Sequence, residues 1–147
     1  MSRQVRTTQR PSEKYWYTLA GYIALGVLGL IYFVIMYQQY SGMEGGSFGI
    51  GFTAGFVLIG ISALGLGIYP ALFKDSMDLR SSRSRWKPKW WFYIGGGFLT
   101  PLLGYLVTVQ LGYESLGLLL AVVAHAFSAT VTSSLYLYRR HKYVGIP

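Results

Sequence analysis

One histidine and a short row of hydroxyl side chains are the residues of this 147-residue chain whose types and spacing could do chemistry. Ala121, His125, Ser128 and Thr132 follow one another at spacings of four, three and four, which places them on one face of a helix. The surrounding stretch is otherwise apolar, and polar side chains do not face lipid cheaply. We therefore predict that His125, Ser128 and Thr132, called the His125 seam below, point into a helical bundle or into an interface between copies.

His125 is the only ionisable side chain that we expect deep within an apolar stretch, and such a group could bind a metal, ligate haem or pass protons. Zinc needs several ligands, and the chain has no cysteine and no second histidine in an apolar stretch. Haem could be held by one histidine or by a pair across a symmetric dimer, but no other feature of the sequence supports it. We expect a neutral, hydrogen-bonded histidine, with no metal and no cofactor.

A proline within an apolar stretch marks a candidate hinge. Pro101 lies about midway along residues 90–111, and its ring would clash with the carbonyl of Gly97, which belongs to a run of three glycines. The spacing predicts a kink formed by Gly97 and Pro101, with Thr100 or a neighbouring helix satisfying the freed backbone group. Such a kink serves either packing or gating, and we favour packing.

The elements that position these residues are four uncharged apolar stretches. Hydrophobic residues make up 52% of the chain and charged residues only 12%, which is more apolar surface than a soluble domain of this size buries. About 20 helical residues cross a hydrocarbon core of about 30 Å, and none of the stretches alternates as a barrel strand would. We predict an all-α bundle of four transmembrane helices in two hairpins, with helices over residues 17–40, 48–73, 90–111 and 116–138.

The basic residues predict the orientation of these helices. The only charged residue in the short turn after the first stretch is Glu44, and the only one in the turn after the third stretch is Glu114. All Lys and Arg residues lie in a basic tail (1–14), a loop (74–89) and the segment after residue 138. Because short positively charged segments beside a span stay in the cytoplasm, we expect a multi-pass protein of the cell membrane with both termini cytoplasmic.

The loop over residues 74–89 is rich in basic side chains, which typically contact anionic lipid head groups. The nearby tryptophans are better explained as interfacial anchors than as base-stacking residues, so the net charge of +8 does not indicate nucleic-acid binding. The predicted head-group contacts are Arg80, Arg83, Arg85, Lys87 and Lys89.

Small residues recur at a spacing of four in the second stretch, at Gly51 and Gly55 and at Ala63 and Gly67. Such spacing lets two helix backbones approach closely, which is how helices associate in lipid. The pattern predicts packing within the bundle, or alternatively self-association through this helix.

Two segments of the second half resemble segments of small membrane proteins of halophilic archaea. They are Trp86-Lys87-Pro88-Lys89-Trp90-Trp91-Phe92-Tyr93, followed by Thr100-Pro101, and the ending from Leu135 to Pro147. The resemblance implies lineage and topology, and it implies no activity because no chemistry is assigned to that family.

Enzyme signatures are missing from the sequence. It contains no phosphate-binding P-loop, no H-E-x-x-H and no G-x-S-x-G, and no stretch holds a pair of carboxylates. We therefore expect a protein that is not an enzyme, most simply an accessory or scaffold subunit of a membrane assembly or a homo-oligomer. The alternative is a small homo-oligomeric transporter or channel whose path is lined by the His125 seam.

Overall fold

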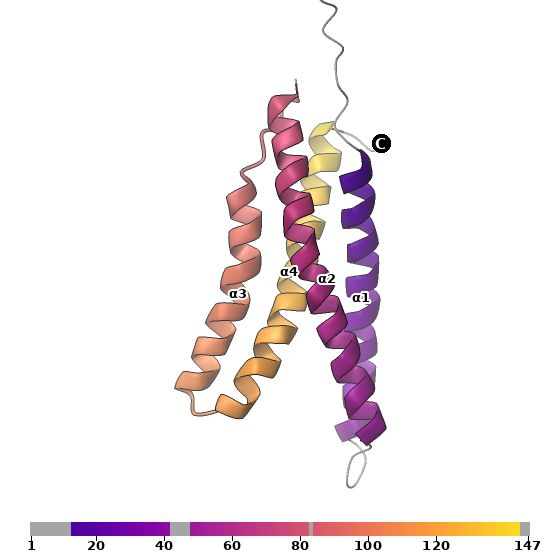
Figure 1. Ribbon diagram of the computed structural model, residues 1–147, viewed down its shortest axis with the longest axis vertical. Coiled ribbons are helices and arrows are strands. Elements are labelled where there is room, and N and C mark those ends of the chain that lie inside the picture. The colour runs from indigo at the N-terminus through magenta and orange to yellow at the C-terminus, as the bar shows by residue number, and fades with distance from the viewer. Residues whose placement is uncertain (1–12, 42–47, 83, 145–147) are drawn as a thin grey trace, which may run out of the picture.

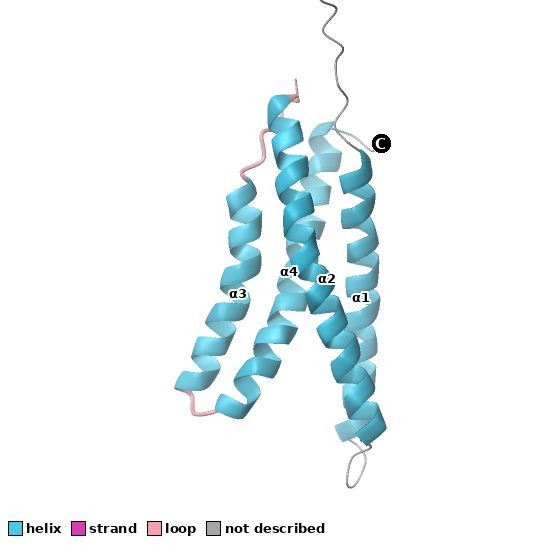
Figure 2. Cartoon of the chain, viewed as in Figure 1, coloured by secondary structure: helices cyan, strands magenta, loops and turns pink. Residues whose placement is uncertain are grey.

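The computed structural model describes residues 13–41, 48–82 and 84–144. These residues form four α-helices and no strand: α1 (Glu13–Ser41), α2 (Phe48–Ser81), α3 (Trp90–Gln110) and α4 (Glu114–Val144). Each helix is long and apolar enough to cross a membrane. The predicted bundle of four membrane-spanning helices is therefore confirmed as a fold (Figures 1 and 2).

Large apolar side chains cover the outside of the bundle, in addition to those that fill its core. Phe56 of α2 is 72% exposed and Leu118 of α4 is 70% exposed. Contiguous apolar surface of this extent is costly in water and costs nothing in lipid tails. The outer surface therefore suits a hydrocarbon solvent.

The helices pair as two hairpins, α1 with α2 and α3 with α4, and α2 and α4 join the hairpins. Both α2 and α4 contact every other helix, whereas the described residues of α1 and α3 do not contact each other. Figure 1 shows the two hairpins meeting at the end where α2 stops and diverging towards the turn between α3 and α4. We call the first of these ends, which also holds the start of α1 and the end of α4, the basic end.

The helices extend further into the basic end than the sequence predicted. α2 continues to Ser81 instead of ending near residue 73, and α4 continues to Val144 instead of 138. Leu72, Ser76 and Leu79 are all buried, so the helical spacing of core residues runs past the last uncharged residue. Hydropathy marks where charge begins and not where a helix ends, so the predicted loop over residues 74–89 is wrong in its first half.

The turn between α3 and α4 is a Schellman motif. Gly112 has φ +82°, its N–H donates to the carbonyl of Val109 at 3.0 Å, and the N–H of Tyr113 donates to the carbonyl of Thr108 at 3.0 Å. This pattern needs a residue in the left-handed region, which glycine adopts without strain. The glycine therefore ends α3 and allows α4 to return directly beside it.

Candidate functional site

His125 contacts α2 near the middle of the bundle. Its Nε2 atom lies 3.3 Å from the hydroxyl of Tyr69, and the Tyr69 ring packs against Phe98 of α3 with ring centroids 4.5 Å apart. A Cβ atom on Gly65 would lie 3.1 Å from Cε1 of His125 and 2.8 Å from the hydroxyl of Tyr22. The missing side chain at Gly65 therefore creates the space that His125 and Tyr22 fill.

The His125 seam and the predicted hinge form one contact. Pro101 has no N–H, so the carbonyl of Gly97 lacks its usual helical donor. The hydroxyl of Ser128 donates to this carbonyl at 3.0 Å, and a Cβ atom on Gly97 would collide with the Tyr69 ring. A neighbouring helix thus satisfies the freed group, as one of the two expectations stated, while Thr100 donates to Gly96 of its own helix.

These contacts fix the segment around Pro101 in place. α3 continues as one helix from Trp90 to Gln110, through the proline. Thr132, the third member of the seam, is half-buried on α4 and does not reach this contact. The structure therefore places His125 and Gly97 against Tyr69 and Ser128 against Gly97, the residue whose carbonyl Pro101 leaves without a donor.

A second polar cluster lies nearer the basic end, and the sequence did not predict it. Asp75 of α2 and Arg140 of α4 are 0% and 2% exposed, and Nε of Arg140 donates to Oδ2 of Asp75 at 3.0 Å. The hydroxyl of Tyr136 donates to the same oxygen at 2.7 Å, and the hydroxyl of Ser76 donates to Tyr136 at 3.3 Å. We call Asp75, Ser76, Tyr136 and Arg140 the carboxylate cluster.

The carboxylate cluster is shielded from solvent by the segment that follows α2. The ring of Trp86 lies 5.2 Å from the ring of Tyr136 and 6.1 Å from that of Tyr143, measured between centroids. Pro88 beside it is fully buried. The aromatic side chains near the end of α4 therefore close the bundle in addition to any interfacial role.

Asp75 escaped the sequence analysis because it follows Lys74, where the uncharged stretch has ended. Asp75 is thus a second buried ionisable side chain, and it lies outside the uncharged stretches in which His125 was expected to be the only one. A signal was present, since Ile68, Leu72, Asp75 and Leu79 continue the three- and four-residue spacing of a buried face. The spacing of four between Tyr136 and Arg140 would have pointed to the partner face.

Two buried oxygens of this region have no hydrogen-bond partner among the described residues, Oδ1 of Asp75 and Oγ of Ser133. His125, Ser133, Tyr136 and Arg140 follow one another on α4 at spacings of eight, three and four, so they share the face that packs against α2. Unpaired buried oxygens are where internal water molecules bind. These oxygens can therefore form hydrogen bonds with internal water. The described residues contain no group of three or more His, Cys, Asp or Glu that could hold a metal ion.

The predicted lipid contacts divide into free and engaged side chains. Arg80, Arg85 and Lys89 are exposed at the basic end, and Arg83 lies outside the described residues. The ammonium of Lys87 donates to the carbonyls of Leu79, Arg80 and Ser82 at 3.1, 2.7 and 2.6 Å. All three of its donors are therefore used to cap the end of α2, and its charge offsets the helix dipole there.

The glycines divide in the same way between packing and open positions. Gly26, Gly29, Gly65 and Gly97 face side chains of neighbouring helices, and a Cβ atom on any of them would be too close to its neighbour. In contrast, Gly67 has nothing within 4 Å of a Cβ atom, and both it and Ala63 are exposed. Packing within the bundle therefore does not explain the pair at Ala63 and Gly67.

No family model, curated protein or solved structure matches this chain. The similarity to membrane proteins of halophilic archaea therefore stays a prediction.

Proposed function

We propose that this chain is a multi-pass protein of the cell membrane, with both termini cytoplasmic, and that it serves as an accessory or scaffold subunit of a membrane assembly. Four apolar helices support the membrane placement. The described basic side chains lie at one end of the bundle, which supports the orientation. Arg80, Arg85 and Lys89 are exposed there, where anionic lipid head groups would meet them.

The observation that carries the assembly role is the outward face of α2. Gly60, Ala63 and Gly67 are all exposed and, at spacings of three and four, share one face. Nothing lies within 4 Å of a Cβ atom on either glycine. Small residues on one open face let another helix backbone approach closely, and such close packing is one source of helix association in lipid.

The inside of the bundle supports the same proposal. Ser128, Asp75 and Arg140 are engaged in contacts between helices of the same chain. Polar groups paired in this way hold the bundle together and present nothing to a substrate from outside. A bundle whose polar groups are paired inside and whose α2 face is open suits a subunit whose task is to bind other helices.

The assembly proposal is tested by native mass spectrometry of the protein extracted from its own membranes in mild detergent. We expect the chain in complexes larger than one copy, and we expect Gly67→Leu to reduce them to the single chain because the new side chain separates the backbones. Gly21→Leu is the matched control, since Gly21 of α1 is also exposed with nothing within 4 Å. Wild-type protein found only as a single chain without partners would contradict the proposal.

A second candidate is the small homo-oligomeric transporter or channel. The unpaired oxygens of Asp75 and Ser133, which lie between His125 and the basic end, favour a path for protons or water. It ranks second because the hydroxyl of Ser128 is bound to Gly97 within the same chain. Equal proton flux into vesicles that contain wild-type protein or His125→Ala would remove its support.

A further inference from the structure

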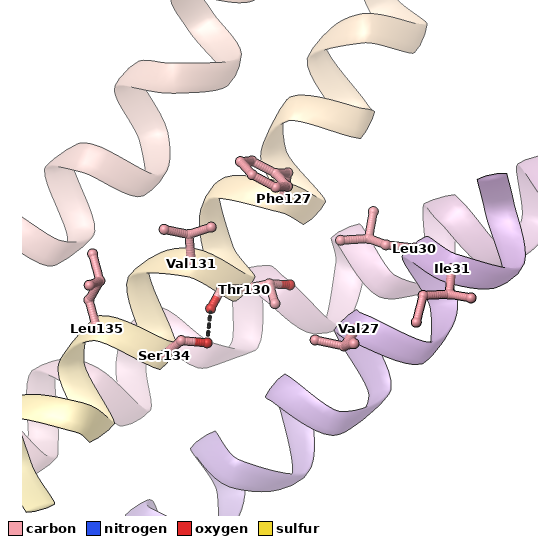
Figure 3. Close-up of a pocket in the computed structure, with 8 residues that line it drawn as sticks. All are labelled: Val27, Leu30, Ile31, Phe127, Thr130, Val131, Ser134 and Leu135. Atoms are coloured by element: carbon pink, nitrogen blue, oxygen red, sulfur yellow. Dashed lines mark hydrogen bonds between the residues drawn. The ribbon is translucent and has the colours of Figure 1, made fainter.

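An open groove runs between α1 and α4 on one side of the bundle (Figure 3). Its volume is about 410 Å³, and its walls include Val27 and Ile31 of α1 and Phe127 and Val131 of α4. Figure 3 shows Val27 and Ile31 on α1 and Phe127 and Val131 on α4, with Thr130 and Ser134 between the two helices. The groove is therefore bounded by apolar groups from both hairpins.

The two hydroxyl side chains in the groove are already satisfied. The hydroxyl of Thr130 donates to the carbonyl of Ala126 at 2.8 Å, and that of Ser134 donates to the carbonyl of Thr130 at 2.8 Å. Neither hydroxyl needs a partner from an occupant, and the remaining wall is hydrocarbon. The groove therefore selects an apolar chain over a polar ligand.

The wall formed by α4 continues from the groove to a cation. Phe127, Val131, Leu135, Tyr138 and Lys142 follow one another at spacings of four, four, three and four, which keeps them on one face. Val131 and Lys142 are 11 residues apart, which is about 16 Å along a helix. One leaflet of the hydrocarbon core is about 15 Å thick, so an acyl chain that lies along Val131 has its head group beside Lys142.

The basic end of the groove has the chemistry of a head-group site. Tyr138 and Lys142 are both exposed, and the ammonium of Lys142 lies 5.8 Å from the centroid of the Tyr143 ring. Aromatic rings beside a lysine are typical of the membrane interface. The first turn of α1 adds Glu13 and Lys14, whose charges offset each other. On α4, Arg139 and Lys142 are both exposed cations, and Nη1 of Arg139 donates to the hydroxyl of Tyr93 at 3.4 Å. The net charge at this end is therefore positive, and Lys142 is the cation that is not engaged with α3.

From the apolar lining of the groove, the distance between Val131 and Lys142 and the positive charge at its basic end, we propose that the groove binds one anionic phospholipid. Its acyl chain lies between α1 and α4, and its phosphate binds Lys142. The inference rests on the membrane placement proposed above and is independent of the assembly role. It adds a defined lipid site to the general basic surface formed by Arg80, Arg85 and Lys89.

The experiment uses the full chain in nanodiscs that contain equal amounts of phosphatidylglycerol and phosphatidylcholine, released in mild detergent and analysed by native mass spectrometry. We expect one phosphatidylglycerol to remain bound to each wild-type chain. Val131→Trp fills the groove and should abolish this retention. Leu118→Trp is its control, because it adds the same ring to α4 at a position that is 70% exposed and away from the groove.

The head-group contact is tested separately by Lys142→Gln. The preference for phosphatidylglycerol over phosphatidylcholine should fall about fivefold, as expected for loss of one basic side chain near the surface. Lys74→Gln, at another exposed lysine near the basic end, should leave the preference unchanged.

Three results would overturn the lipid site. They are retention unaffected by Val131→Trp, equal effects of Lys142→Gln and Lys74→Gln, and a lipid-free dimer in which a second copy covers the groove. If Val131→Trp does not fold, Val27→Trp fills the groove from α1 instead. The same spectra report the number of chains, so failure of the lipid site is distinguishable from failure of the assembly role.

Discussion

The two ends of the bundle are held together by different means. At the basic end the hairpins are joined to each other by side chains that are far apart in sequence, as in the pair of Asp75 and Arg140, which are 65 residues apart. At the opposite end the hairpin of α3 and α4 is closed by local contacts in the turn at Gly112. The comparison indicates that buried polar pairs help to specify where the hairpins meet, in addition to the close packing that drives helix association in lipid.

The sharpest test of this difference is Asp75→Ala. It leaves the guanidinium of Arg140 buried without its partner, and breaking a buried ion pair costs about 3–5 kcal/mol. We expect a loss of this size in the free energy of unfolding, measured by denaturant titration in detergent micelles. Asp78→Ala, three residues away at a half-buried position, should cost less than about 1 kcal/mol.

The double variant Asp75→Leu with Arg140→Met separates loss of the charge pair from loss of packing. Replacing both partners by apolar side chains of similar volume should recover most of the stability. A double variant as unstable as Asp75→Ala would show that the pair itself, and not the stranded charge, stabilises the contact.

The next largest effect is expected at Gly97. A Cβ atom there collides with the Tyr69 ring, and overpacking of a core costs about 1–3 kcal/mol. Gly97→Ala should therefore lower the unfolding free energy and shift the fluorescence of a probe placed on α3. Gly96→Ala is the control, because Gly96 faces open space and alanine is the better helix former, so the variant should be neutral or slightly more stable.

At the opposite end, Gly112→Ala forces a side chain into the left-handed region at φ +82° and should cost about 1–2 kcal/mol. Hydrogen exchange should increase at the ends of α3 and α4 and stay unchanged at the contacts between α2 and α4. Increased exchange around Asp75 in this variant would contradict the independence of the two ends.

The smallest effect is expected at Ser128. Ser128→Ala removes the donor to the Gly97 carbonyl, and a hydrogen bond between helices in a membrane contributes about 0.6 kcal/mol on average. Adding Pro101→Ala returns a backbone N–H to that carbonyl. In a double-mutant cycle the two substitutions should therefore be non-additive, and strict additivity would show that the hydroxyl and the proline act separately.

The sequence by itself determined the four helices, their pairing as hairpins and the inward direction of Ser128. These properties depend on the hydropathy and the spacing of residues within one stretch of chain. Both are set by the sequence of that stretch and do not depend on which other helices it contacts. The sequence also predicted correctly that Pro101 leaves the Gly97 carbonyl without its helical donor, because the missing N–H is a property of the proline itself.

Only the tertiary structure decided which polar groups meet. From the sequence, Asp75 is a charged residue beside Lys74 with no identified partner, and only the packing of α4 supplies that partner. Lys87 was predicted to contact lipid, and only the structure shows its ammonium bound to the carbonyls at the end of α2. In both cases the decisive quantity is a distance of about 3 Å between groups on separate segments. Hydropathy sums over one segment and contains no such distance. The spacing within α2 could therefore have indicated that Asp75 is buried, whereas its pairing with Arg140 and Tyr136 could not be predicted.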